Sequence, residues 1–314
     1  MRSGFGTDKK RGNAVNLSKK NVLEAFPNVK TAFKSFPNPL VVSTTYTSNF
    51  AVYEESGGEF IISKWNNLID DTQYLRQTNV AQYPAISSVE SLNGSPGISF
   101  LNTDNLASVQ SFSSDKTTII QIFKKKVINS GTNVSLFSSL LGNLGGSVTA
   151  HGFGFSFDSL AANTNRENIQ VFYRTSSTTL GGNANFSNAG LFNNLLQDFD
   201  EILFYITDIE VSQDIREINV RIRDSNLNNV FSTSTYTVNQ ANLLSGGTQL
   251  TDSDWDSLFG SAGSRKLPSY YTRMNYSGAL GYNMVHYFYA VYNEIFSDSD
   301  LFKIISIIKN MYGL

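Results

Sequence analysis

The chain has 314 residues, a formal net charge of −2 and no cysteine. Charged residues make up only 16% of it, whereas aromatic residues reach 13%, with 23 Phe and 15 Tyr. This length allows one large β-sandwich with an appendage or two small domains, and the lack of cysteine excludes disulfides and thiol chemistry. A composition rich in aromatic residues and in Ser, Thr and Asn favours β-strands over long helices.

Neither a membrane span nor a secretory signal is predicted. No stretch approaches the roughly 20 apolar residues that cross a bilayer. The N-terminal sequence is basic but lacks the apolar core of a signal peptide. We therefore expect no contact with a membrane and no export by that route.

Residues 1–39 are predicted to form a basic arm, separate from a body at 40–314. Residues 1–36 hold eight basic and two acidic side chains, a net of +6, so the remainder carries −8. Such a charge division suits contacts with another subunit, and the alternative is an arm folded back on its own body. The basic residues expected to bind a partner are Arg2, Lys9, Lys10, Arg11, Lys19 and Lys20.

Within the arm, residues 1–17 are predicted to be extended because they are rich in glycine and poor in apolar groups. Residues 18–36 are predicted to form one or two short helices, since Val29, Phe33 and Phe36 fall on one helical face. Prolines at positions 37 and 39 then stop the helix.

From residue 40 onward the pattern predicts an all-β body. Its clearest strand is 117–123, where β-branched residues run almost without interruption. A hairpin is predicted over 216–236, because turn residues at 224–229 separate two apolar runs. The remaining predicted strands are 41–46, 49–53, 59–62, 98–101, 134–141, 148–157, 169–174, 202–209 and 284–292, with 106–112 as a loop or edge strand and 176–188 as a loop.

A helix is predicted to close the chain. Ser297 and Asp300 have the spacing of a capping box, in which each side chain bonds the other's backbone N–H. The apolar stripe of this helix is Leu301, Ile304, Ile305 and Ile308, and Gly313 follows its end.

The order of motifs near both ends of the body is distinctive. A buried Trp65 precedes an amide-rich turn that begins at Asn66, and the tight turn at Asn93 and Gly94 leads through Pro96 into a strand. At the other end, a strand and a short helix close on Tyr312, Gly313 and Leu314.

This order resembles the concanavalin A-like, or laminin G-like, jelly-roll domains, and the resemblance covers roughly 41–314. It implies an antiparallel β-sandwich of the jelly-roll type. These motifs specify a fold and not an activity. The family includes glucanases as well as lectins and the decoration and adhesion proteins of bacteriophages.

The laminarinase-type glucanases of that family carry Glu-x-Asp-x-x-Glu on one strand, because retaining hydrolysis needs two carboxyls roughly 5–5.5 Å apart. No Glu of this chain is followed two residues later by Asp, and the cluster at 198–201 has the wrong order. The only histidines, His151 and His286, have no spacing typical of a metal site or a catalytic triad. We therefore predict no catalytic residue, no cofactor and no enzymatic activity.

Asp252, Asp254 and Asp256 copy the start of a calcium loop. The sixth and twelfth positions, however, hold Ser257 and Gly263 instead of Gly and Glu. We interpret 252–259 as a single helical turn with acidic residues at its positive end, and predict no metal site.

The sequence leaves two functions open. The first is a non-catalytic structural protein of a virion, with the jelly-roll body displayed on the outer surface of a capsid or tail and the arm bound to other virion proteins in an oligomer. This prediction also implies synthesis in the host cytoplasm and no binding to nucleic acid, because the body is acidic.

The alternative is a lectin-like adhesin that binds surface glycans, with a glycoside hydrolase as a minor alternative. Exposed tyrosines in a Gly/Ser-containing loop region can stack on sugar rings. The candidate stacking residues are Tyr270, Tyr271, Tyr276 and Tyr282.

Overall fold

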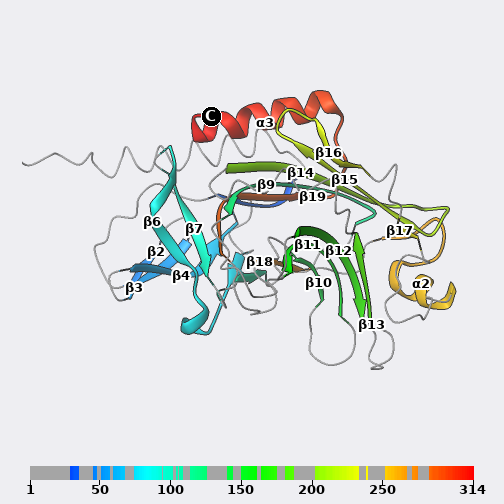
Figure 1. Ribbon diagram of the computed structural model, residues 1–314, viewed down its shortest axis with the longest axis horizontal. Coiled ribbons are helices and arrows are strands. Elements are labelled where there is room, and N and C mark those ends of the chain that lie inside the picture. The colour runs from blue at the N-terminus through cyan, green and yellow to red at the C-terminus, as the bar shows by residue number, and fades with distance from the viewer. Residues whose placement is uncertain are drawn as a thin grey trace, which may run out of the picture.

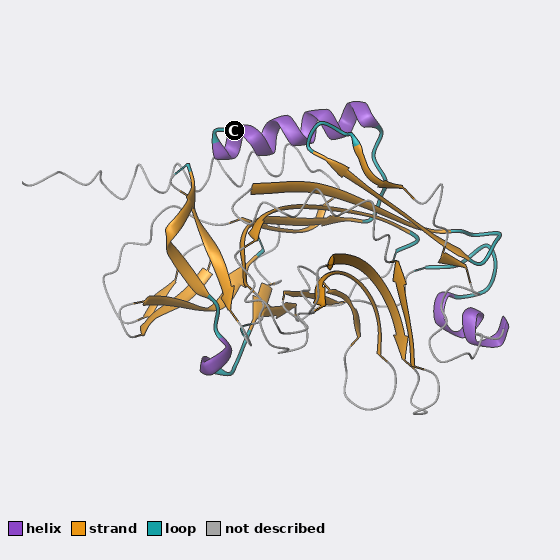
Figure 2. Cartoon of the chain, viewed as in Figure 1, coloured by secondary structure: helices purple, strands orange, loops and turns teal. Residues whose placement is uncertain are grey.

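The protein is an antiparallel β-sandwich with one long helix at its C-terminal end (Figures 1 and 2). The predicted fold class is therefore confirmed. The computed structural model describes residues 29–34, 45–47, 51–56, 59–67, 74–93, 95–101, 104, 106–108, 114–125, 140–143, 150–160, 164–174, 181–186, 202–232, 238–239, 252–266, 271–274 and 283–314.

The first layer is centred on β19 (Asn283–Tyr292). Strand β19 pairs with β9 (Lys116–Lys125), β9 with β14 (Ile202–Val211), and β14 with β15 (Glu217–Asp224), all antiparallel. The flanking strands are β1 (Val29–Lys34) and β7 (Ser95–Leu101) beside β19, and β16 (Asn229–Ser232) and β17 (Val238–Asn239) beside β15.

The second layer is also antiparallel and continues from the first through β6 (Ala85–Leu92), which pairs with β7 and β4. In order of pairing, its strands are β2 (Thr45–Thr47), β3 (Ala51–Ser56), β4 (Glu59–Asn66), β5 (Tyr74–Arg76), β8 (Leu106–Ser108), β18 (Tyr271–Met274), β10 (Leu140–Asn143), β11 (Ala150–Leu160), β12 (Thr164–Arg174) and β13 (Gly181–Phe186).

The β9–β14–β19 sheet is buried on both faces. Ile119 and Ile120 are neighbours in β9 and so point to opposite faces, yet both are 0% exposed. Figure 1 shows the reason, because α3 (Asp298–Tyr312) lies on one side of this sheet and β11 and β12 lie on the other. This explains the nearly continuous apolar sequence of β9, which a sheet with one solvated face would not need.

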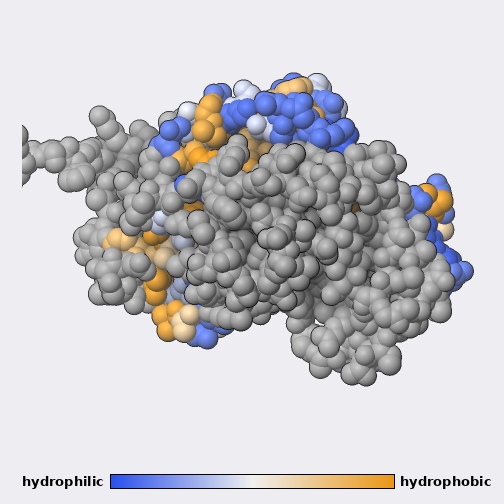
Figure 3. Space-filling view, viewed as in Figure 1, coloured by the Kyte–Doolittle hydropathy of each residue, from blue (hydrophilic) through white to orange (hydrophobic). Residues whose placement is uncertain are grey.

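The sequence of α3 explains which side of the helix is buried and where the helix begins and ends. Its predicted stripe (Leu301, Ile304, Ile305 and Ile308) is buried, whereas the opposite side of the helix presents mostly hydrophilic residues (Figure 3). The Ser297 hydroxyl accepts a bond from the Asp300 backbone N–H, as the capping box predicts. Gly313 ends the helix with a φ of 65°, in the left-handed region that favours glycine.

The predicted turn at Asn93 also holds the end of this helix. Asn93 has a φ of 48° and joins β6 to β7. Its side-chain amide donates to the carbonyl oxygens of Tyr312 and Gly313, at 2.5 and 2.8 Å. The Tyr312 hydroxyl in turn donates to the Tyr287 carbonyl at 2.5 Å. The hairpin therefore satisfies carbonyl groups that the last helical turn leaves without intrahelical partners.

Two local predictions were wrong. Residues 29–34, expected to be helical, form β1 and pair with β19 from Val29 opposite Tyr292 to Lys34 opposite Phe288. This part of the predicted arm therefore belongs to the body sheet. Residues 181–186, expected in a loop, form β13 along the edge of β12. In both cases pairing with a strand distant in the chain outweighed the local pattern.

The rest of the predicted arm, including its six basic candidates (Arg2, Lys9, Lys10, Arg11, Lys19 and Lys20), lies outside the described residues. The boundary between residues 39 and 40 stays a prediction. Among the helices that the structure describes, none has the length and apolar character needed to cross a membrane.

Replacing the helix cap should destabilise the fold. The variant Ser297→Ala removes the side chain that satisfies the Asp300 N–H, so we expect the free energy of unfolding to fall by about 1 kcal/mol. Ser306→Ala, at an exposed position inside the same helix, is the matched control and should change stability by less than about 0.5 kcal/mol. Equal effects in urea unfolding would contradict the assigned cap.

Candidate functional site

Only one of the four predicted glycan-stacking tyrosines lies among the described residues. Tyr271 is the first residue of β18, and Tyr270, Tyr276 and Tyr282 lie outside the described residues. Their role in stacking stays a prediction.

The three aspartates of the calcium-like motif lie on α2 (Asp252–Phe259), as the interpretation of an acidic helix start predicts. Arg216 forms an ion pair with Asp252, and Arg265 lies 3.7 Å from Asp256. Within the described part of the chain, no group of three or more His, Asp or Glu residues is arranged to hold a metal ion. Asp252 and Asp256 therefore lie beside arginines of the same chain.

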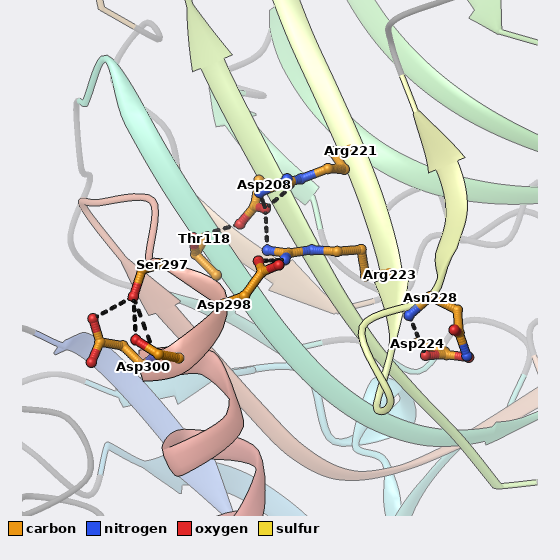
Figure 4. Close-up of polar contacts among 10 residues, drawn as sticks. Thr118, Asp208, Arg221, Arg223, Asp224, Asn228, Ser297, Asp298 and Asp300 are labelled. Atoms are coloured by element: carbon orange, nitrogen blue, oxygen red, sulfur yellow. Dashed lines mark hydrogen bonds and ion pairs between the residues drawn. The ribbon is translucent and has the colours of Figure 1, made fainter.

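An ion cluster whose centre, Asp208 and Arg223, is buried lies between α3 and the first layer (Figure 4). Asp208 on β14 accepts bonds from Nη2 of Arg221 and Nη2 of Arg223, both at 2.7 Å. Arg223 is 2% exposed, and its Nη1 donates to Asp298, the first residue of α3, at 2.6 Å. The Thr118 hydroxyl lies 2.8 Å from both Asp208 Oδ1 and the Glu294 carbonyl oxygen.

This cluster has a structural role. Every oxygen of Asp208 already accepts a bond from the protein, and Arg223 joins Asp208 of the sheet to Asp298 of the helix. Removing one partner of such a buried pair typically costs 3–5 kcal/mol, because the other charge is left buried and uncompensated. The cluster fixes the start of α3 over the sheet, and we assign it no ligand.

His286 is a buried residue of β19, as expected for a strand residue. Its ring makes an edge contact with Phe100 at a centroid distance of 5.4 Å and a tilted contact with Phe123 at 6.0 Å. Burial lowers the pKa of His286 from its ordinary 6.5 to about 3, because an apolar site disfavours the charged imidazolium. The side chain is therefore neutral in the folded protein at neutral pH.

A partly exposed face with mixed chemistry lies on β4 and β5. In this antiparallel pair Lys64 is opposite Arg76, Trp65 is opposite Leu75, and Asn66 is opposite Tyr74. Trp65 and Leu75 are 0% exposed and point into the core. Because side chains alternate along a strand, the other four lie on the opposite face of the pair.

We call Lys64, Asn66, Tyr74 and Arg76 the β4–β5 face. Arg76 is exposed, and the other three are half-buried. The Lys64 ammonium lies over the Tyr74 ring, 4.0 Å from its centroid, which is a cation–π contact. The face thus combines an aromatic ring, an amide and two cations within two neighbouring strands.

Sequence reasoning missed this face. Asn66 was predicted to begin a polar turn, whereas it is the last residue of β4. A signal was nevertheless present, because Lys64-Trp65-Asn66 and Tyr74-Leu75-Arg76 both place a core residue between two residues of a different kind. This is the period-2 pattern of a half-buried strand.

No family model matches the chain, and no curated protein matches it. Similar solved structures include a mutant GH54 α-L-arabinofuranosidase soaked with 4-nitrophenyl α-L-arabinofuranoside, with a TM-score of 0.49, 9% identity, and coverage of 94% of this chain and 65% of that one. A mutant Trypanosoma rangeli sialidase displaying trans-sialidase activity has a TM-score of 0.44, 10% identity, and coverage of 98% and 40%.

A third similar structure is domain 4 of AbnA, a GH43 extracellular arabinanase from Geobacillus stearothermophilus, in complex with arabinotriose. Its TM-score is 0.31, with 11% identity and coverage of 88% of this chain and 87% of that one. The chain thus spans less than two thirds of the arabinofuranosidase and sialidase chains. Similarity of this degree carries no activity, substrate or residue role over to this chain.

The comparisons contradict two predictions. The similar structures are glycoside hydrolases and a domain of an arabinanase, which overturns the prediction of a non-catalytic structural protein of a virion. The same finding overturns the prediction that the chain is not an enzyme. The predicted sandwich class stands, whereas no comparison shows a link to bacteriophages.

Acid should destabilise the protein through His286. The unfolded chain binds a proton at this residue below a pKa of about 6.5 and the folded protein only near 3, so stability falls as the pH drops from 6.5 towards 3. His286→Phe removes this group from a site already lined by aromatic rings. By pH 5, we expect wild type to have lost about 1–2 kcal/mol more stability than the variant, relative to pH 7.5.

Urea unfolding of both proteins at pH 7.5, 6.5 and 5 measures this difference. Parallel pH profiles would contradict a neutral, buried His286.

Proposed function

We propose that this protein binds carbohydrate and that the ligand lies across the β4–β5 face. The observation that carries the proposal is the half-buried Tyr74 ring, which directly opposes Asn66 in the cross-strand pair and has Lys64 over it. The proposal also retains the glycan-binding alternative from the sequence, with different residues in the role of stacking.

The chemistry of the face suits a sugar. A pyranose ring has an apolar side formed by C–H groups, which packs on an aromatic ring, and hydroxyl groups around its edge. Tyrosine provides a large apolar surface together with a polar hydroxyl. Binding sites generally combine such apolar surface with a few polar groups that fix orientation.

The core behind this face is rigid enough to hold these side chains in place. Trp65 and Leu75, which alternate with the four residues of the face, are fully buried. Each therefore fixes the strand position of its two neighbours. A site built on paired strands keeps its geometry better than one built on loops.

Removing the Tyr74 ring should abolish most of the binding. We expect Tyr74→Ala to weaken the affinity for the best glycan of an array about ten-fold, because the variant loses the stacking surface, an effect of about 1.4 kcal/mol. Tyr74→Phe keeps the ring and should stay within about three-fold of wild type. Calorimetric titration of the purified protein measures these affinities.

Phe302→Ala is the matched control, because Phe302 is an aromatic residue on α3 that is 53% exposed and lies outside the β4–β5 face. It should bind as wild type does. Failure of the wild-type protein to bind any glycan, or wild-type affinity in Tyr74→Ala, would overturn the proposed function.

A further inference from the structure

The turn that begins at Asn93 contains a chemically reactive pair of residues. Asn93 and Gly94 form the only Asn-Gly pair in the sequence. This dipeptide is the one most prone to deamidation, because glycine has no side chain to shield its backbone nitrogen from the neighbouring amide. The fold nevertheless favours the pair here. Leu92 pairs with Ser95, which leaves two residues to connect β6 and β7, and Asn93 has a φ of 48°, which asparagine tolerates better than most residues.

The reactive side-chain amide of Asn93 is also the group that holds the end of α3. Its nitrogen donates to the carbonyl oxygen of Tyr312 at 2.5 Å and to that of Gly313 at 2.8 Å. These carbonyls lie at the C-terminal end of the helix, where the helix dipole places negative charge. The contact therefore depends on a hydrogen-bond donor, because an ionised carboxylate has only acceptors and these oxygens repel it.

We propose that Asn93 is a deamidation site and that its conversion loosens the end of α3. In the first step the backbone nitrogen of Gly94 loses its proton to solvent and forms a bond to Cγ of Asn93. The Cγ–Nδ2 bond breaks, and the leaving nitrogen takes up one proton and departs as ammonia. Water then adds to one of the two carbonyls of the cyclic imide and opens the ring, which yields aspartate or isoaspartate.

Either product undoes the contact with the helix. Both carry a carboxylate in place of the amide, and isoaspartate also lengthens the main chain by one carbon in a two-residue connection. The loosened last turn admits water to Ile308 and Tyr312, which are 0% and 2% exposed in the intact fold. The start of the helix stays fixed, because Asp298 remains bound to Arg223.

The same contact controls the rate of the reaction. Ring closure requires the Asn93 side chain to turn towards the backbone nitrogen of the next residue, so its two bonds to the helix end break first. The Tyr312 hydroxyl, which donates to the Tyr287 carbonyl, keeps the helix end in place and so keeps these bonds closed. Deamidation therefore follows opening of the helix end and does not need unfolding of the whole protein.

The reaction is tested in the full chain at pH 8.5 by mass analysis of the peptide that contains Asn93. We expect conversion to be about ten-fold slower in the folded protein than in urea, because two hydrogen bonds must break first. Tyr312→Phe keeps the ring but loses the bond to Tyr287, and should speed conversion of the folded protein about five-fold. Ser297→Ala is the matched control, because it weakens the other end of the same helix, and should leave the rate unchanged.

The consequence is tested by placing the carboxylate directly. Asn93→Asp should lower the Tm by about 5 °C, because it loses two hydrogen bonds and sets a negative charge against the helix end. Asn310→Asp adds the same charge at an exposed position of the last helical turn without touching the contact. This matched control should lower the Tm by less than about 2 °C.

The converted wild-type protein gives a second measurement that needs no variant. Its added negative charge allows its separation from unconverted protein by anion exchange. Amide hydrogen exchange should be faster in the converted form at residues 309–312 and unchanged at residues 303–306.

Three outcomes would overturn the proposal. The first is no conversion at Asn93 in the folded protein over about ten times the period in which the unfolded chain converts fully. The second is equal acceleration by Tyr312→Phe and Ser297→Ala, which would place the reaction in the globally unfolded chain. The third is unchanged hydrogen exchange at residues 309–312 after conversion, or a Tm of Asn93→Asp within about 1 °C of wild type.

Discussion

Burial of both faces of the β9–β14–β19 sheet is the constraint on which the rest of the structure depends. One face of this sheet requires α3 as a cover and the other requires the second layer, and Ile119 and Ile120 are fully excluded from water on opposite sides. The helix must therefore be held at both ends. The Asp208–Arg223–Asp298 contacts hold its start, and the Asn93 side chain holds its end.

Charged side chains of this protein lie in two different surroundings. Between sheet and helix, Arg223 is matched by Asp208 and Asp298, because an unpaired charge at a 2% exposed position would be costly. On the β4–β5 face, Lys64 and Arg76 are less buried than Arg223, so water screens their charges. The Tyr74 ring beside them is the feature on which the proposed carbohydrate binding depends.

The predictable part of the fold was the part with local signals. The β-branched run of β9, the Asn93 turn and the cap and stripe of α3 each follow from neighbouring residues, and all were predicted. Strands β1 and β13 were not, because each is stabilised by pairing with a strand whose position no local pattern reveals. The β4–β5 face was not predicted for a related reason. The alternation around Trp65 and Leu75 is visible in the sequence, but the register that sets Lys64 opposite Arg76 is not.

The most direct test of this account is to map where a bound glycan contacts the folded protein. In a titration of isotope-labelled protein with the best glycan of an array, followed by amide NMR, the account predicts that the largest shift changes fall on residues 64–66 and 74–76, with α3 unaffected. Changes centred on other strands, or on the segment around Tyr270 and Tyr276, would contradict it and place the binding site elsewhere.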